Sequence, residues 1–279
     1  MDILVAPKLK KFKKIGVAFG GGGARGFALI GVIRAFEEEG ITFDYIAGTS
    51  IGSIMGAMLA YGLTSAQMEE IATKIRIKDI RKSKIPLVPS STEAIQDIII
   101  EIVGDIKIED LKTPFCAVAV DMLTGDEVDI TTGNLAKALA GSCAVPAIFH
   151  AVEFEDKILF DGGLQNTIPA DVLRKKGCDA VISVDINSSR GQGAKSTKYF
   201  DLIVASVDIM MKSNAIKGYL NSDLIIKPDL KKFKATKVDG MHEMIEEGYR
   251  ATKEMMPQIK ALLLRKTIKK KHWWGFGVF

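Results

Sequence analysis

The sequence predicts an α/β fold of three layers, α/β/α, in which helices cover both faces of a largely parallel central sheet. Short apolar runs that are typical of buried strands alternate along the chain with segments of helical periodicity. Of the residues, 47% are hydrophobic and 26% are charged, as is common for a globular α/β protein. The chain has no internal repeat and no low-complexity linker. We therefore expect a single domain over residues 1–279, with a catalytic core at about 14–190 and a C-terminal helix and tail at 240–279.

The first part of the chain contains two predicted strand–helix units. In order, they are a strand at Ile15–Phe19, a helix at Ala24–Glu39, a strand at Asp44–Ala47 and a helix at Ile51–Tyr61. Apolar residues recur at helical spacing in the first helix, and Gly40 after it is a typical helix terminator. The second helix is small and apolar on all sides, which indicates that it is buried.

The alternation continues along the rest of the chain. Further strands are predicted at Phe115–Val120, Val181–Asp185 and Leu224–Ile226, with helices at Leu135–Leu139, Pro169–Lys176 and Phe200–Met211. From about Asp239 onward the pattern predicts one long helix. Residues 81–93 carry two prolines and three serines, which predicts a loop. Whether residues 81–97 form a plain connection or a mobile lid is open at this point.

Composition and charge argue against several classes of protein. The formal net charge of +4 is too mild to indicate a nucleic-acid partner. No apolar run approaches the roughly 20 residues that span a bilayer, and the N-terminus has its apolar residues before its charges, the reverse of a secretory signal. Cys116, Cys143 and Cys178 show no Cys-x-x-Cys spacing, which favours reduced thiols. We expect a soluble, cytoplasmic protein.

The motif Gly48-Thr49-Ser50-Ile51-Gly52 joins the second predicted strand to the helix after it. A Gly-x-Ser-x-Gly sequence at such a junction is typical of a nucleophile elbow, a tight turn whose flanking residues must lack bulk. The helix N-terminus would place partial positive charge beside Ser50, and the N–H of Ile51 would point at the oxyanion of a tetrahedral intermediate. Ser50 is the candidate nucleophile; the alternative is a turn that only packs a helix on a sheet.

A second glycine-rich segment, Gly21-Gly22-Gly23-Ala24-Arg25-Gly26, follows the first strand and opens the first helix. Its spacing fits a dinucleotide-binding loop, which requires an acidic residue about 20 positions further on, at the end of a second strand. Asp44 comes near that position but begins a strand instead of ending one. The same segment fits an oxyanion hole, with unobstructed N–H donors at Gly22 and Gly23 and positive charge from Arg25. On this motif alone both interpretations stay open.

A serine nucleophile needs a base. The chain has three histidines, none of them in a recognisable motif: His150, His242 and His272. The better candidate is Asp161, where an apolar approach ends in an acid that Gly162 and Gly163 follow. Burial would raise the pKa of this carboxyl from its usual value of about 3.9 to a range in which it can act as a base. The alternative is an Asp-Gly-Gly hairpin turn without chemistry.

The three motifs GGGARG, GTSIG and DGG, in this order, closely resemble those of the patatin-like phospholipase family and of its bacterial members in particular. The resemblance runs from about Lys14 to Ile186. It includes the stretches Phe115–Asp129, Leu139–Phe149, Asp161–Pro169 and Ala180–Ile186. Residues Lys82–Asp97 depart from the family pattern, which leaves the acyl-chain preference open.

The resemblance implies a patatin-like fold and a lipid acyl hydrolase of the phospholipase A or lysophospholipase type. It implies a Ser-Asp dyad, with Ser50 as the nucleophile that forms an acyl-enzyme and Asp161 as the base. The loop Gly21–Gly26, including Arg25, would form the oxyanion hole. Neither a metal nor an organic cofactor is implied. Two alternatives are an acyltransferase that uses the same acyl-enzyme and a nucleotide-binding protein that uses the glycine loop.

The C-terminus combines the cations Lys269–Lys271 with the aromatic residues Trp273, Trp274, Phe276 and Phe279. Cations next to aromatic side chains favour the interface of an anionic lipid surface. The segment suggests peripheral contact with a membrane. It fits a solvated or packed tail equally well.

Overall fold

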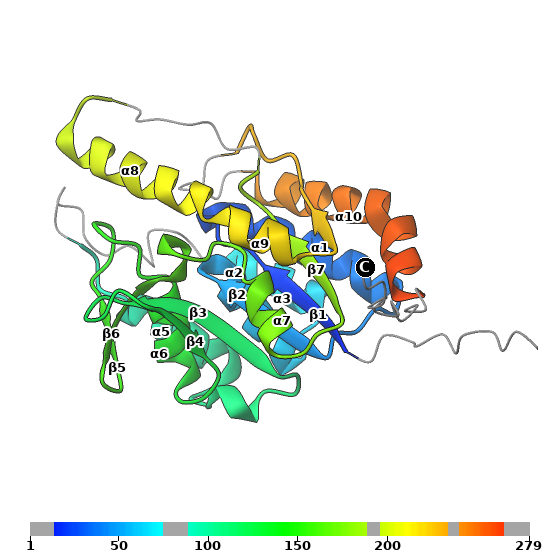
Figure 1. Ribbon diagram of the computed structural model, residues 1–279, viewed down its shortest axis with the longest axis horizontal. Coiled ribbons are helices and arrows are strands. Elements are labelled where there is room, and N and C mark those ends of the chain that lie inside the picture. The colour runs from blue at the N-terminus through cyan, green and yellow to red at the C-terminus, as the bar shows by residue number, and fades with distance from the viewer. Residues whose placement is uncertain (1–13, 75–88, 189–195, 234–239, 265–279) are drawn as a thin grey trace, which may run out of the picture.

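The computed structural model describes residues 14–74, 89–188, 196–233 and 240–264. Within these ranges the strands form one sheet in the order β5-β6-β3-β2-β1-β7-β8, with β4 paired to β3 (Figure 1). The parallel part consists of β1 (Ile15–Phe19), β2 (Tyr45–Thr49), β3 (Phe115–Asp121), β7 (Ala180–Val184) and β8 (Leu224–Ile226). The strands β4 (Glu127–Ile130), β5 (Val152–Phe154) and β6 (Lys157–Asp161) add antiparallel pairs at one edge. The prediction of a largely parallel sheet is confirmed.

Helices cover both faces of this sheet, as the three-layer prediction requires. The larger core lies under α1 (Phe27–Glu38), α2 (Ile51–Tyr61), α3 (Ser65–Lys74), α5 (Glu93–Val103), α6 (Leu135–Ser142) and α10 (Met241–Leu263). The smaller core lies under α7 (Ala170–Lys175) and α9 (Ala215–Asn221). Side chains alternate between the two faces along each strand. In β1, for example, Val17 and Phe19 belong to the larger core and Ala18 to the smaller one.

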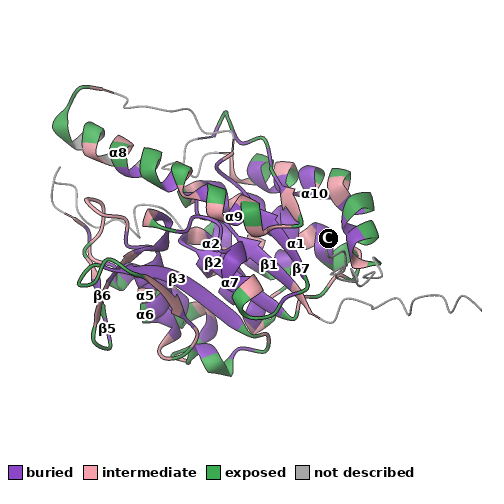
Figure 2. Ribbon diagram, in the orientation of Figure 1, coloured by how far each residue is buried: buried purple, intermediate pink, exposed green. Residues whose placement is uncertain are grey.

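Burial follows the layers. The central strands are buried except for Ile15, and helix α2 exposes no residue, as predicted. Outer helices such as α1 and α10 are buried on one side and exposed on the other (Figure 2). Helix α8 (Tyr199–Ser213) is the exception, because much of its surface is exposed (Figure 2). Among the described residues no helix is both long and apolar enough to cross a bilayer.

One predicted helix boundary is wrong. The first helix does not begin at Ala24: Gly23–Gly26 form a 3-10 turn, and α1 begins only at Phe27. Gly23 has a φ of 58°, a left-handed conformation that cannot continue into a regular helix. The helices α3, α5 and α9 and the strands β4, β5 and β6 were not predicted at all.

The predicted loop at 81–93 falls largely on residues 75–88, which lie outside the described residues. After them, Ser90 pairs with Phe149 in an isolated bridge, and helix α5 begins at Glu93. The last part of segment 81–97 is therefore helical and does not belong to a loop. The tail with Lys269–Lys271 also lies outside the described residues.

Candidate active site

Ser50 occupies a sharp turn between strand β2 and helix α2. Its φ of 54° and ψ of −131° are a conformation that a residue with a side chain rarely adopts, at a cost on the order of 1–3 kcal/mol. Glycines on both sides make the turn sterically feasible. A Cβ atom on Gly48 would lie 2.3 Å from the carbonyl oxygen of Gly52, and one on Gly52 would lie 2.2 Å from that of Phe19. The Gly-x-Ser-x-Gly motif thus forms the strained strand–helix turn that its sequence predicts.

Ser142, at the end of α6, holds this turn in place. Its Oγ accepts a hydrogen bond from the backbone N–H of Ser50 at 3.0 Å and donates one to the carbonyl of Val118 in β3 at 2.6 Å. Ser142 is fully buried. On the other side, Ser53 Oγ donates to the Ser50 carbonyl at 2.6 Å. Both backbone polar groups of Ser50 are therefore satisfied by neighbours that fix its orientation.

Asp161 ends strand β6 and is fully buried. Its position is fixed by register with Ala119 of β3 and by a 3.0 Å hydrogen bond from its N–H to the Ala144 carbonyl. Burial raises the pKa of Asp161 to about 6, although the nearby Ser50 hydroxyl and the N–H of Gly163 lower it. Oδ1 accepts the Gly163 N–H at 2.8 Å, whereas Oδ2 has no hydrogen-bond partner among the described residues. The carboxylate thus lies near the Ser50 hydroxyl and has one oxygen without a hydrogen-bond partner among the described residues.

The glycine loop between β1 and α1 lies against the nucleophile. A Cβ atom on Gly21 would lie only 3.1 Å from Cβ of Ser50. The loop is fixed through Gly21, whose N–H donates to Thr167 at 3.1 Å and whose carbonyl accepts Nδ2 of Asn187 at 2.7 Å. The N–H groups of Gly22 and Gly23 make no backbone hydrogen bond to the described residues. They are the donors that the loop leaves open.

Arg25 is buried behind the loop. Its guanidinium donates two hydrogen bonds to the carbonyl of Phe233, at 3.1 and 2.9 Å, and one to Oδ1 of Asn187 at 3.2 Å. Asn187 in turn holds Gly21. Through these contacts Arg25 ties the glycine loop to Asn187, which follows β7, and to Phe233, which follows β8.

A second network supports the turn from the face of the sheet that α7 and α9 cover. Thr49 Oγ1 donates to the Asn166 carbonyl at 2.8 Å. The Asn166 amide donates to Glu127 at 3.0 Å and to Asp171 at 2.7 Å.

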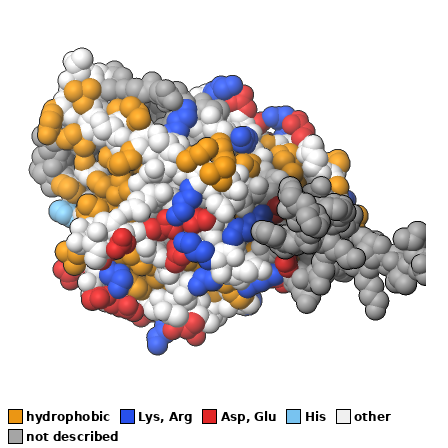
Figure 3. Space-filling model, viewed as in Figure 1, with side chains coloured by type: hydrophobic (Ala, Val, Ile, Leu, Met, Phe, Trp, Pro, Cys, Tyr) orange, Lys and Arg blue, Asp and Glu red, His pale blue; other side chains and the backbone are white. Residues whose placement is uncertain are grey.

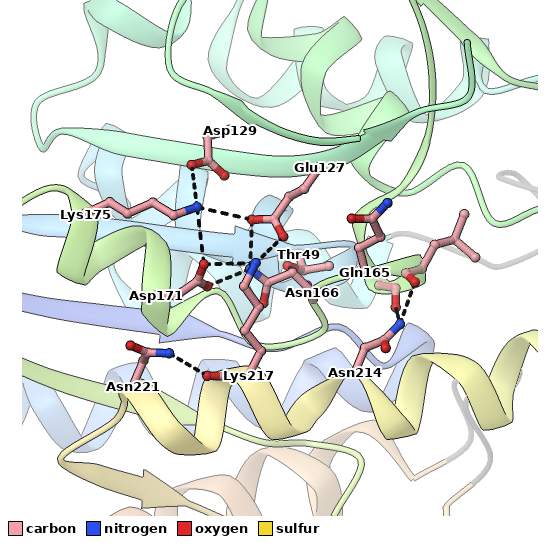
Figure 4. A network of polar contacts seen from close by, with 12 residues as sticks. Thr49, Glu127, Asp129, Gln165, Asn166, Asp171, Lys175, Asn214, Lys217 and Asn221 are labelled. Atoms are coloured by element: carbon pink, nitrogen blue, oxygen red, sulfur yellow. Dashed lines mark hydrogen bonds and ion pairs between the residues drawn. The ribbon is translucent and has the colours of Figure 1, made fainter. Parts of the chain in front are cut away.

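These two carboxylates belong to a cluster of ion pairs. Figure 4 shows Lys175 and Lys217 between the carboxylates of Glu127, Asp129 and Asp171, with ion pairs of 2.5 to 3.8 Å. Charges on α7, α9 and β4 therefore anchor the residue that precedes Ser50.

The residues that other hypotheses need lie elsewhere. Asp44 Oδ2 accepts the N–H of Ile15 at 2.7 Å, so this carboxylate lies where β1 and β2 begin, at the edge of the sheet opposite to Ser50. That position argues against a ribose contact in a dinucleotide site. His150 and His242 are exposed, and His242 lies 3.1 Å from Glu69 on α3. In the described ranges no three His, Cys, Asp or Glu side chains are grouped to hold a metal ion.

The sequence pointed to Ser50, Asp161 and the glycine loop, and the fold brings all of them to one edge of the sheet. The sequence did not indicate Ser142, Asn166 or Asn187 as residues of the site. Ser142 belongs to a stretch of small residues in which no local signal distinguishes it. Asn187 follows the buried strand β7 closely, which is a weak signal for a polar contact at a strand end, whereas Asn166 follows the exposed Gln165 and has no such signal.

Comparisons with known proteins identify the family of the chain. The family model of the patatin-like phospholipases matches residues 17–174, which include Ser50, Asp161 and the glycine loop. An uncharacterized NTE family protein of Mycobacterium bovis is 30% identical over 223 residues, 75% of this chain and 60% of the relative. The mouse patatin-like phospholipase domain-containing protein 7 is 33% identical over 183 residues, 62% of this chain and 14% of its own. The chain thus spans 60% or less of the length of these relatives.

Solved structures share the fold at low sequence identity. VipD from Legionella pneumophila has a TM-score of 0.58 at 13% identity, covering 91% of this chain and 67% of its own. Human GIVD cytosolic phospholipase A2 has a TM-score of 0.51 at 10% identity, covering 90% and 59%. Since identities this low support the fold alone, the assignment depends on the family match over the residues that form the site. By that match the chain belongs to the patatin-like phospholipase family.

Proposed function

We propose that the protein is a serine-dependent lipid acyl hydrolase, of the phospholipase A or lysophospholipase type, that works through a Ser50–Asp161 dyad. One observation carries the proposal. Ser50 is held in a strained turn next to a fully buried carboxylate whose pKa burial raises to about 6. A base with this pKa is largely ionised at neutral pH and still has affinity for a proton.

The first half of the reaction acylates the enzyme. Asp161 takes the hydroxyl proton of Ser50 while Oγ attacks the carbonyl carbon of the ester, which gives a tetrahedral intermediate. When the intermediate collapses, the ester C–O bond breaks and the leaving alcohol receives the proton from Asp161. The acyl group then remains bound to Ser50 as an ester.

The second half releases the acyl group. Asp161 takes a proton from water, and the hydroxide attacks the acyl carbonyl carbon. The bond to Oγ breaks, Ser50 recovers its proton from Asp161, and the carboxylic acid leaves. One carboxylate serves both halves, so no histidine is required.

Backbone donors would stabilise the oxyanion in both halves. The N–H groups of Gly22 and Gly23 are candidates because no backbone acceptor among the described residues occupies them. Helix α2 begins directly after Ser50, and the partial positive charge at its N-terminus acts in the same direction. A donor of this kind typically contributes about 10²–10³ in rate.

The substrate class rests on the family and on the mouse relative, which is named as a patatin-like phospholipase domain-containing protein. The test is hydrolysis of p-nitrophenyl butyrate and of phosphatidylcholine vesicles by wild type, Ser50→Ala and Asp161→Asn. Both variants are expected to lose on the order of 10⁴-fold in kcat. The controls His150→Ala and His242→Ala should keep most activity. Full activity of Ser50→Ala would exclude the proposal.

Product analysis separates hydrolysis from acyl transfer. Free fatty acid should remain the main product when an alcohol is added as acceptor. A transesterified product in excess would instead assign the same acyl-enzyme to an acyltransferase.

A further inference from the structure

Helix α8 exposes three large apolar side chains on the side that faces solvent, next to the exposed Ser206 and Ser213. Val207 and Met211 are buried against the protein. On the outer side Leu202, Ile209 and Met210 are 44%, 49% and 45% exposed. These positions recur at helical spacing and form one stripe, whereas a surface helix normally directs polar side chains outward. The outer stripe has no packing role within the described part of the chain.

The exposed apolar surface extends beyond α8. On α9, Ile216 is 59% and Leu220 is 79% exposed, and on the β3–β4 turn Met122 and Leu123 are 50% and 69% exposed. Figure 3 shows hydrophobic side chains gathered over α8. We call the outer side of α8, α9 and the β3–β4 turn the apolar face. Large apolar side chains exposed close together on a surface mark a site of association with a protein or a membrane.

Each of these elements is tied to the loop that carries Asp161. A Cβ atom on Gly163 would lie 2.3 Å from Cε of Met211, so α8 touches the loop directly. Asn214, between α8 and α9, donates to the Leu164 carbonyl (Figure 4). Gln165 of the same loop donates to Gly125 in the β3–β4 turn. The apolar face therefore borders the catalytic loop on two sides.

We propose that the apolar face docks the protein onto the surface of a lipid bilayer. The inference rests on the proposed function, because a lipid ester has to pass from a bilayer to Ser50. A face that borders the Asp161 loop on two sides shortens that path, whereas a protein partner at the same place would obstruct it. A surface helix with apolar residues on one side lies in the plane of the bilayer interface with that side immersed.

The proposal differs from an anchor made of the basic C-terminal tail in what it requires of the lipid. The stripe residues Leu202, Ile209 and Met210 carry no charge. Binding through them needs no anionic lipid, so it should occur on pure phosphatidylcholine and persist at high salt. An electrostatic anchor would instead require anionic lipid and weaken as salt screens it.

The test is flotation with phosphatidylcholine vesicles at low and high salt, in a Ser50→Ala background that prevents turnover. The triple variant Leu202→Ser/Ile209→Ser/Met210→Ser should reduce vesicle binding at least about tenfold. The matched control is Ile100→Ser/Leu264→Ser, which removes apolar side chains that are 40% and 77% exposed on other surfaces. The control should bind as well as the parent.

Two results would overturn the docking proposal: flotation of the triple variant equal to that of its parent, or an equal loss in the control. Self-association through the apolar face without vesicle binding would also overturn it. When Ser50 is kept, the triple variant should hydrolyse p-nitrophenyl butyrate at the wild-type rate. If wild type hydrolyses no ester at all, the proposed function fails, and flotation still decides the docking proposal separately.

Discussion

The backbone N–H of Ser50 donates a 3.0 Å hydrogen bond to Oγ of Ser142, and this hydroxyl donates a 2.6 Å hydrogen bond to the Val118 carbonyl. The contact joins helix α6, strand β3 and the strained turn in one buried chain of hydrogen bonds. A strained φ persists only where the surroundings hold it. Ser142 is thus the side chain that holds the nucleophile in its orientation.

Replacing Ser142 with Ala should lower kcat more than it raises KM. The variant leaves the Ser50 N–H and the Val118 carbonyl without their partner, which costs about 1–3 kcal/mol in the free energy of unfolding. Steady-state kinetics on p-nitrophenyl butyrate and urea unfolding measure the two effects. Ser65→Ala is the control, since Ser65 makes buried hydrogen bonds to Glu37 away from the site. Equal losses in kcat in both variants would mean that Ser142 only stabilises the fold and does not orient Ser50.

Replacing Gly21 with Ala should remove activity while the protein still folds. The new Cβ would lie 3.1 Å from Cβ of Ser50 and 3.3 Å from the Thr49 carbonyl, a crowding that small shifts can relieve. Those shifts displace the nucleophile, so we expect a loss of about 10²-fold in kcat/KM. Circular dichroism and thermal unfolding show whether the variant is folded, and steady-state kinetics measure the loss in kcat/KM. Wild-type kinetics in a folded variant would show that the glycine loop does not affect catalysis by Ser50.

Activity should rise with pH through the pKa of Asp161, which is about 6. The base acts in its ionised form, so kcat/KM on a neutral soluble ester should fall about tenfold per pH unit well below 6 and reach a plateau above about 7. A pH–rate profile with p-nitrophenyl butyrate measures this. A profile that is flat between pH 5 and 7 would contradict the assignment of Asp161 as the base.

The same pKa makes a prediction about stability. Burial raises the pKa of Asp161 in the folded state above its unfolded value of about 3.9, so folding favours the protonated form. Ionised Asp161 therefore destabilises the fold above pH 6, and the penalty disappears below about pH 4. Asp161→Asn should be more stable than wild type at pH 8 by up to about 3 kcal/mol, with little difference at pH 4.

Thermal unfolding at both pH values checks this prediction. Asp126→Asn is the control, because Asp126 is an exposed carboxylate on the β3–β4 turn. No pH-dependent gain is expected for it. A destabilised Asp161→Asn at pH 8 would mean that the ionised carboxylate holds the fold together.

The strand–helix units around Ser50 could be predicted from the sequence because their signals are local. Glycines on both sides of Ser50 mark the turn, and continuous apolar runs mark β1, β2 and β7. Helix α5 was missed although Ile95, Ile99 and Val103 recur at helical spacing. The two prolines just before it, at 86 and 89, indicate a loop and mask the start of this helix.

The support of the site could not be predicted in the same way. Ser142 meets Ser50 only because α6 packs beside β3, and Arg25 meets Phe233 only because the chain returns past β8. Serine, asparagine and lysine are common residues whose partners far along the chain leave no local pattern. Arg25 shows this limit: its position in the glycine loop indicated a charge at the site, but no local signal indicated its hydrogen bonds to Phe233 and Asn187.

The most direct test of the account is covalent trapping of the nucleophile. A long-chain alkyl fluorophosphonate loses fluoride when a serine oxygen attacks its phosphorus, which leaves a stable adduct of known mass. Intact-protein mass spectrometry and peptide mapping should find one adduct on wild type, located on Ser50. The adduct should be absent in Ser50→Ala and form far more slowly in Asp161→Asn. An unmodified wild type, or an adduct on any other residue, would contradict the Ser50–Asp161 dyad.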